Sequence, residues 1–114
     1  MAVQGGGCLE QHVPDRVGDT GHCLGAGEFA RRTVRLVART RMAGLLGATT
    51  TAHCYHHQAV AEHPGYVAAG HDAADGTLEA MEVPGDPFCV GVQWHPESGD
   101  DHRLFEALVA AAHR

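Results

Sequence analysis

The stretch that decides the fold is Phe88-Cys89-Val90-Gly91-Val92-Gln93-Trp94-His95-Pro96-Glu97. Residues 88–93 are almost continuously apolar, which predicts a strand buried on both faces. Pro96 disfavours a helical backbone at His95 and keeps that residue extended. Side chains two apart in an extended segment point to the same side, so His95 and Glu97 should emerge together where this strand ends.

A histidine and a glutamate placed in this way can do chemistry. A carboxylate beside an imidazole fixes the tautomer of the ring and stabilises the imidazolium, which suits a general base that serves a nucleophile. The alternative is a surface turn that contains proline and has no catalytic role. The buried strand leading directly into the segment favours a site, because rigid elements commonly position functional loops. His95 and Glu97 are therefore candidate catalytic residues.

Strands, turns and helices are expected on both sides of this stretch. Asp75-Gly76 predicts a hairpin turn, and Pro84-Gly85-Asp86-Pro87 predicts another. Asp100 or Asp101 can cap a final helix with an apolar stripe at helical spacing. Alternation and β-branched residues predict strands over 33–37, 49–55, 66–71 and 77–83, and a short helical turn over 41–46; the stripe consists of Leu104, Phe105, Leu108, Val109 and Ala112.

The first third of the chain has a different character. Gly5-Gly6-Gly7 follows the first residues at once, which is unusual for the start of a domain. Residues 12–32 contain Pro14 and several glycines, and we expect them to form a long surface loop. The expected order is a loop-rich start, several strands with a hairpin, the deciding strand and a terminal helix.

Composition limits the class of protein. The chain has 114 residues, of which 44% are hydrophobic and 19% charged, so a single globular domain is expected. The net charge of −6 argues against nucleic-acid and anionic-membrane partners, although ten histidines could offset it at low pH. No signal peptide or membrane-spanning run is recognisable, and the four cysteines form no C-x-x-C pair, so we expect a cytoplasmic protein with free thiols.

A second polar motif, Tyr55-His56-His57-Gln58-Ala59-Val60, follows the strand predicted over 49–55. Polar groups at a strand end are typical of binding crevices in α/β proteins. Taken alone, however, the motif favours a polar loop with two solvated histidines.

These motifs together resemble the class I glutamine amidotransferase-like family, peptidase C26-like, in the branch that hydrolyses γ-glutamyl-γ-aminobutyrate. The resemblance runs along nearly the whole chain in the right order. The matching segments are Gly6 to Asp15 (G-G-T-L-x-Q-x-L-P-D in the family), His53 to Val60 (N-S-Y-H-H-Q-A-V), Ala74 to Ala80 (D-G-x-I-E-A) and Phe88 to Glu97 (F-x-x-G-V-Q-W-H-P-E).

The resemblance implies a fold, a reaction and residue roles. The fold would be α/β: the C-terminal part of a flavodoxin-like three-layer sheet domain, with partly parallel strands, a β-hairpin extension and a terminal helix packed on one face. His95 and Glu97 would complete a Cys-His-Glu triad whose thiolate attacks a γ-glutamyl amide and forms a thioester. Tyr55, His56, His57 and Gln58 would line the pocket for a γ-glutamyl small-molecule substrate. The resemblance implies no cofactor and no metal.

The sequence departs from the family at the nucleophile. The family's cysteine lies in a G-x-C-x-G elbow, which would fall before Met1, so residues 1–114 would form a single partial domain, inactive alone. A separate chain could supply the missing half. Cys8 lacks the preceding strand that an elbow requires, and Cys54 is a second thiol with no better claim. A missing half would also leave strand edges and an apolar face exposed, and self-association is expected.

Two alternatives remain. One is a non-catalytic remnant that binds a γ-glutamyl ligand or a partner protein. The other is a histidine-rich metal-binding module, although its residues lack the paired spacing of structural zinc sites. Its candidate ligands are His53, Cys54, His56 and His57, with His63 and His71 further along.

Overall fold

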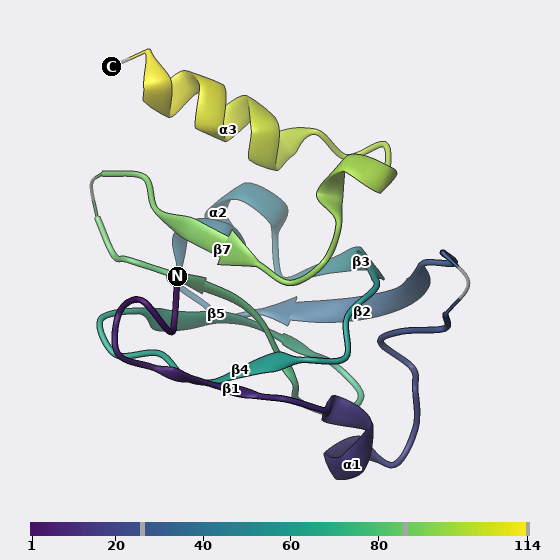
Figure 1. The fold of residues 1–114 in the computed structure, drawn as a ribbon. Helices are drawn as coiled ribbons and strands as arrows, with labels where there is room; N and C mark the ends of the chain where they lie inside the picture. Colours follow the sequence, from purple (N-terminus) through teal and green to yellow (C-terminus); the bar gives the residue numbers. More distant parts are fainter. Residues whose placement is uncertain (26, 86, 114) are drawn as a thin grey trace.

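The fold is built around a curved antiparallel sheet of five strands, in a computed structural model that describes residues 1–25, 27–85 and 87–113 (Figure 1). The spatial order of the strands is β3-β2-β5-β6-β7. Their bounds are Ala30–Leu36 (β2), Thr49–Cys54 (β3), Val67–Asp72 (β5), Leu78–Glu82 (β6) and Val90–Val92 (β7). All five lie where strands are predicted, with ends that differ by up to three residues.

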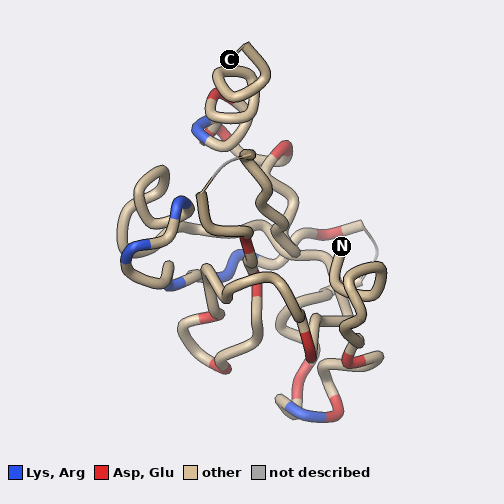
Figure 2. Tube along the Cα trace, turned by 90° about the vertical axis from the view of Figure 1, so that its left-hand side faces the viewer, with Lys and Arg blue, Asp and Glu red and all other residues tan. Residues whose placement is uncertain are grey.

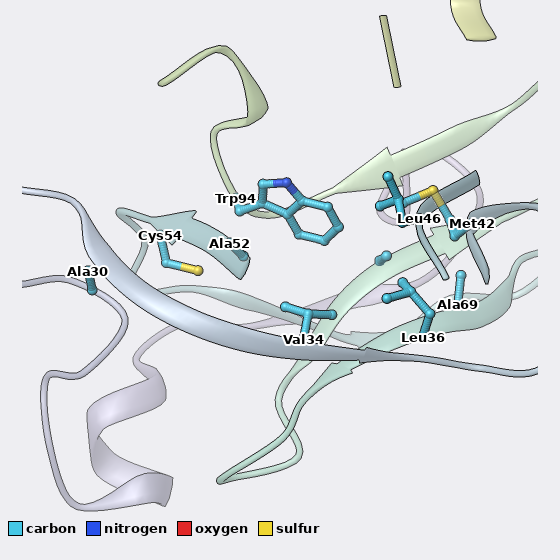
Figure 3. Packing of buried hydrophobic residues seen from close by; sticks show 10 residues of the cluster. Ala30, Val34, Leu36, Met42, Leu46, Ala52, Cys54, Ala69 and Trp94 are labelled. Carbon is cyan, nitrogen blue, oxygen red and sulfur yellow. The ribbon is translucent and has the colours of Figure 1, made fainter. Parts of the chain in front are cut away.

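A short helix covers the core side of this sheet. Helix α2 (Arg41–Leu46) begins where Thr40 Oγ1 accepts a hydrogen bond from the Ala43 backbone N–H, 3.1 Å away, and it ends at Gly47 with φ 85°. This confirms the helical turn predicted over 41–46. In Figure 3 the Trp94 ring lies over the sheet beside Leu46. The buried cluster consists of Ala30, Val34, Leu36, Met42, Leu46, Ala52, Cys54, Ala69, Ala80 and Trp94.

The hairpin between β5 and β6 turns at Asp75-Gly76, as predicted. Gly76 adopts φ 75°, a conformation that glycine reaches without steric cost. The Asp72 carboxylate accepts hydrogen bonds from the backbone N–H groups of Ala74 (2.8 Å) and Asp75 (3.1 Å). The turn is therefore held by an aspartate that β5 itself supplies.

The N-terminal third contains more regular structure than expected. Strand β1 (Cys8–Glu10) pairs with β4 (Ala59–Glu62) in a second, two-stranded sheet. A side chain at Gly7 would overlap the Glu62 carbonyl, which explains the glycine before this pairing. Helix α1 (Val13–Val17) and the first residues of β2 lie inside the loop predicted over 12–32, so the irregular segment is shorter than predicted.

The terminal helix α3 (Arg103–Ala112) is present but not buried. A 3₁₀ turn (Pro96–Ser98) precedes it, and Asp101 Oδ1 accepts a hydrogen bond from the Arg103 backbone N–H at 3.1 Å. Leu104 packs against the core. Phe105, Leu108 and Val109 are 39%, 52% and 55% exposed, so most of the predicted stripe faces outward.

Two details of the predicted sheet are wrong. Strand β7 is half-buried and lies at the edge of the sheet, because only β6 pairs with it, whereas we expected it to be buried on both faces. Every strand pair among the described residues is antiparallel, so no parallel pairing is found there. The mixed α/β class itself is confirmed. Ala26 of the predicted loop, Asp86 of the predicted turn and Arg114 lie outside the described residues.

Charged residues are dispersed over the structure. Figure 2 shows basic residues in several separate places along the trace, interspersed with acidic ones. Within the described ranges, the structure has no helix of the length and apolarity needed to span a membrane.

Candidate functional site

His95 is positioned by its neighbours in the deciding stretch. Trp94, 7% exposed, anchors the chain in the core immediately after β7. The His95 backbone N–H donates to the His53 carbonyl at 2.9 Å and so ties this segment to the end of β3. The Ser98 hydroxyl donates to the His95 carbonyl at 2.9 Å. His95 thus lies just beyond the end of β7 and beside the end of β3.

His95 and Glu97 form an exposed pair. His95 Nδ1 lies 2.7 Å from Glu97 Oε1, so the proton on Nδ1 points to the carboxylate and Nε2 is left to accept a proton. The backbone N–H of Glu97 and the His95 ring hold the pKa of Glu97 below its ordinary value. Both side chains are exposed, by 40% and 61%. This is the tautomer that a general base needs.

A groove of about 740 Å³ opens beside His95. Its floor is the polar face of β2 and β3, where the antiparallel register places Arg31 opposite His53 and Thr33 opposite Thr51. His53 Nδ1 lies 2.7 Å from Ser98 Oγ, at the His95 end of the groove. The groove has room for a small polar molecule beside the candidate base.

The four consecutive residues predicted to bind substrate direct their side chains to different partners. The Tyr55 ring lies 6.2 Å from Phe29, whose ring centroid is 5.1 Å from that of His95. The His56 ring points inward, the exposed His57 lies beside His12, and Gln58 Nε2 donates to Gln11 Oε1 at 2.7 Å. Of the four, the structure relates only Tyr55 to His95, through Phe29.

The inward ring of His56 belongs to a buried polar cluster that the sequence did not reveal. His56 Nε2 lies 2.9 Å from Glu79 Oε1, and the Glu79 side chain is fully buried. His22, 2% exposed, reaches the same carboxylate with Nδ1 at 2.9 Å and Asp75 with Nε2 at 2.6 Å. Cys54 Sγ lies 4.0 Å from Glu79 Oε1. No local pattern marks His22, which lies in the irregular segment before β2.

A second carboxylate pair adjoins this cluster. Arg32 Nε and Nη2 donate to the two oxygens of Asp72 at 2.7 and 2.9 Å. Burial raises the pKa of Asp72, but Arg32 and two backbone N–H groups outweigh it and lower that pKa overall. Burial likewise opposes ionisation of Asp75, whose hydrogen bonds with Thr77 and His22 hold its pKa at about 2. Arg32 lies on the core-facing side of β2, with Ala30 and Val34. A charged residue at a core-facing strand position was therefore the sequence signal that could have indicated a buried ion pair.

The titration of the remaining cluster members follows from the same surroundings. Burial lowers the pKa of His22, but the nearby carboxylates of Glu79 and Asp75 raise it above its ordinary value overall. Burial, followed by the charge of Glu79, raises the pKa of the Cys54 thiol to about 12. Cys54 is therefore a poor nucleophile. Cys8 is exposed on β1, and in the described part of the chain no cysteine sulfur is hydrogen-bonded to His95.

Known proteins match both the sequence and the fold. The sequence profile of the Peptidase C26 family matches residues 1–97. A Mycobacterium tuberculosis protein whose name places it among the glutamine amidotransferases is 50% identical over 109 residues, which are 94% of this chain and 35% of that protein. A glutamine amidotransferase-like protein of Rickettsia prowazekii is 44% identical over 61 residues, half of this chain and 22% of that protein.

A solved structure matches the fold. The crystal structure of a glutamine amidotransferase from Methylobacillus flagellatus superposes with a TM-score of 0.60 at 18% identity, over 97% of this chain and 39% of that one. The fold is thus that of part of a class I glutamine amidotransferase-like domain. The chain belongs to the Peptidase C26 family. It spans about a third of the length of the mycobacterial relative.

Proposed function

We propose that residues 1–114 carry the base half of a γ-glutamyl amide hydrolase. His95 is the general base, and Glu97 orients it and stabilises its protonated form. The observation that carries this proposal is the 2.7 Å contact between His95 Nδ1 and Glu97 Oε1 at the exposed end of β7, which leaves Nε2 free. The catalytic thiolate comes from a cysteine outside these residues, on the same or a separate polypeptide.

The mechanism follows from the geometry of this pair. Nε2 takes the proton of the thiol, and the thiolate attacks the γ-carbonyl carbon. The imidazolium then protonates the leaving amine, and a thioester remains on sulfur. Nε2 next takes a proton from water, which attacks the thioester and releases glutamate and the free thiol. Glu97 stays ionised and stabilises the imidazolium in both halves of the cycle.

The substrate is a γ-glutamyl amide of a small amine, in line with the resemblance to the γ-glutamyl-γ-aminobutyrate branch. The proposed contacts come from Tyr55, beside Phe29, and from the loop that continues through His57 and Gln58. His56 supports this loop from within, because its Nδ1 donates to the Gln58 carbonyl at 2.8 Å. We place the reaction in the cytoplasm and assign it no cofactor.

The exposed side chains of α3 support the need for a further part of the domain. Phe105, Leu108 and Val109 form an apolar strip with no cover among the described residues. An additional α/β segment that carries the nucleophile would bury this strip. Without such cover, the strip favours self-association of the chain.

The test is glutamate release from γ-glutamyl-γ-aminobutyrate. The DNA upstream of Met1 is read for an apolar strand ending in G-x-C-x-G, and the extended chain is expressed beside residues 1–114. We expect activity only in the extended chain, with a loss of at least about 100-fold on His95→Ala. His63→Ala is the matched control, because His63 bonds to the Tyr66 carbonyl away from the groove. Hydrolysis by residues 1–114 alone, lost on His95→Ala, would overturn the assignment of the nucleophile.

A second candidate is a non-catalytic remnant that binds a γ-glutamyl ligand. The absence, within the described residues, of a cysteine bonded to His95 favours it. Its outcome in the same experiment is an upstream frame without the elbow, together with γ-glutamyl-γ-aminobutyrate binding that is unaffected by His95→Ala.

A further inference from the structure

We propose that the buried cluster of His22, Cys54, His56 and Glu79 is a zinc site. The cluster is separate from the His95–Glu97 pair. One ligand atom from each of the four residues lies within 4.8 Å of every other. They come from the irregular segment before β2, the end of β3, the loop after it and strand β6. An ion held there would fasten the irregular segment to the sheet.

The proton on His56 is already committed outside the cluster. Its Nδ1 lies 2.8 Å from the Gln58 carbonyl oxygen, which can only accept a hydrogen bond, so Nδ1 carries the proton. In the neutral ring Nε2 is then a bare lone pair. That lone pair faces the two oxygens of Glu79 at 2.9 and 3.1 Å. Two acceptors cannot bond to each other without a cation between them.

The proton on His22 is committed in the same way. Its Nε2 lies 2.6 Å from Asp75 Oδ2, so Nε2–H donates to this carboxylate. Its Nδ1 is buried, lies 2.9 Å from Glu79 Oε1 and has no partner in hydrogen-bond geometry among the described residues. In the neutral ring, a second lone pair therefore points at the same buried carboxylate. A histidine that donates outward to a carboxylate is the arrangement that orients metal-binding imidazoles.

The donor set selects the kind of ion. One sulfur, two imidazole nitrogens and one carboxylate oxygen make a four-coordinate set of the type that binds Zn²⁺, whereas Mg²⁺ and Ca²⁺ require oxygen ligands. The charges of a Cys54 thiolate and the Glu79 carboxylate would neutralise the ion in a site that excludes water. Neighbouring Asp72 is already engaged by Arg32 in two hydrogen bonds.

The ligand separations also fit. Zinc bonds of about 2.0–2.3 Å at tetrahedral angles place ligand atoms about 3.3–3.7 Å apart. The atoms here are 2.9 Å apart for His22–Glu79 and His56–Glu79, and 4.0 Å apart for Cys54–Glu79. Adjustments of less than an ångström in these three separations would bring them into that range. The rival is a cluster without metal, in which extra protons on both rings satisfy Glu79.

The test uses the untagged chain, stripped with EDTA under reducing conditions and titrated with Co²⁺ as a spectroscopic substitute for zinc. We expect visible bands of tetrahedral cobalt and a near-ultraviolet thiolate-to-cobalt band, both saturating at one equivalent and both displaced by Zn²⁺. Cys54→Ser should lose the thiolate band, and His22→Ala should weaken binding at least about tenfold. Cys89→Ser and His113→Ala are matched controls and should leave both bands unchanged.

The two explanations predict opposite readouts. Absence of the thiolate band at one equivalent, whether the chain is folded or unfolded, would overturn the zinc site and leave the protonated cluster. A thiolate band that is lost in Cys89→Ser as fully as in Cys54→Ser would also overturn the zinc site. As a readout independent of any variant, zinc at one equivalent should raise the unfolding temperature of the wild-type chain, and EDTA should reverse the rise.

Discussion

His95 and Glu97 lie 2.7 Å apart at the surface, two residues apart in sequence; His56 and Glu79 lie 2.9 Å apart, joined across the fold, with the carboxylate buried. The two contacts are similar in length but differ in what they contribute to folding stability. The exposed pair is solvated whether or not it is made, so it contributes little to folding and can exchange protons. The buried pair is stabilising only while every member has a partner. Exposure thus separates a histidine–glutamate pair that contributes little to stability from one on which the fold depends.

The variant expected to lose the most stability is Glu79→Ala. In the metal-free cluster, protons on the two rings hold them to Glu79. Removing the carboxylate leaves both rings without this partner, so the free energy of unfolding should fall by about 3–5 kcal/mol. Urea denaturation in the presence of EDTA measures this loss without a metal contribution. Glu97→Ala is the matched control in the exposed pair and should leave stability unchanged. Equal losses in the two variants would refute the contrast.

A smaller loss is expected from Arg32→Ala. This change removes two charged hydrogen bonds from Asp72, whose side chain is 1% exposed, and should destabilise the fold by about 2–3 kcal/mol. Arg31→Ala is the control on the neighbouring position, because Arg31 faces the groove side of β2. We expect it to change stability by less than about 0.5 kcal/mol. Denaturation midpoints at pH 7 measure both, and similar midpoints would contradict the buried role of Arg32.

The smallest effect concerns Asp101 at the start of α3. Hydrogen bonds and charge from Arg103 lower the pKa of Asp101 to about 2. A lowered pKa in the folded state stabilises the fold above the unfolded pKa of about 4, and this contribution disappears as the pH falls through about 2. The difference in urea midpoint between wild type and Asp101→Asn should therefore be present at pH 7 and vanish near pH 2. A difference that grows on acidification would contradict this sign.

Local signals account for the parts of the fold that were predicted. Asp75-Gly76 marks a hairpin turn by its own backbone preferences, and Thr40 and Gly47 bound α2 by capping. The pairing of β1 with β4 has no local signal, because each strand is only a few residues long and about 50 residues separate them. The edge position of β7 depends on which strands flank it, and an apolar run alone does not give its burial.

The site residues, too, were predictable only where they are neighbours in sequence. His95, Pro96 and Glu97 are neighbours in sequence, so extended geometry alone predicts their approach. The buried cluster joins His22, His56 and Glu79 from three distant segments, and only the folded sheet brings them together. The sequence did group Cys54 with His56 as potential ligands, but it grouped them with His53 and His57, whose rings point elsewhere.

The carboxylates of the β5–β6 turn have a practical consequence for protein engineering. An Asp-Gly tip is commonly chosen for an epitope insertion or for new chain ends. Here the Asp75 carboxylate at the tip is bonded to His22, and Asp72 at the base of the turn is bonded to Arg32 of β2, so lengthening the tip would disturb contacts with two other segments. The turn at Pro64-Gly65 between β4 and β5 is exposed and its Gly65 already adopts φ 83°. Labels, insertions and new chain ends are therefore better placed at Pro64-Gly65.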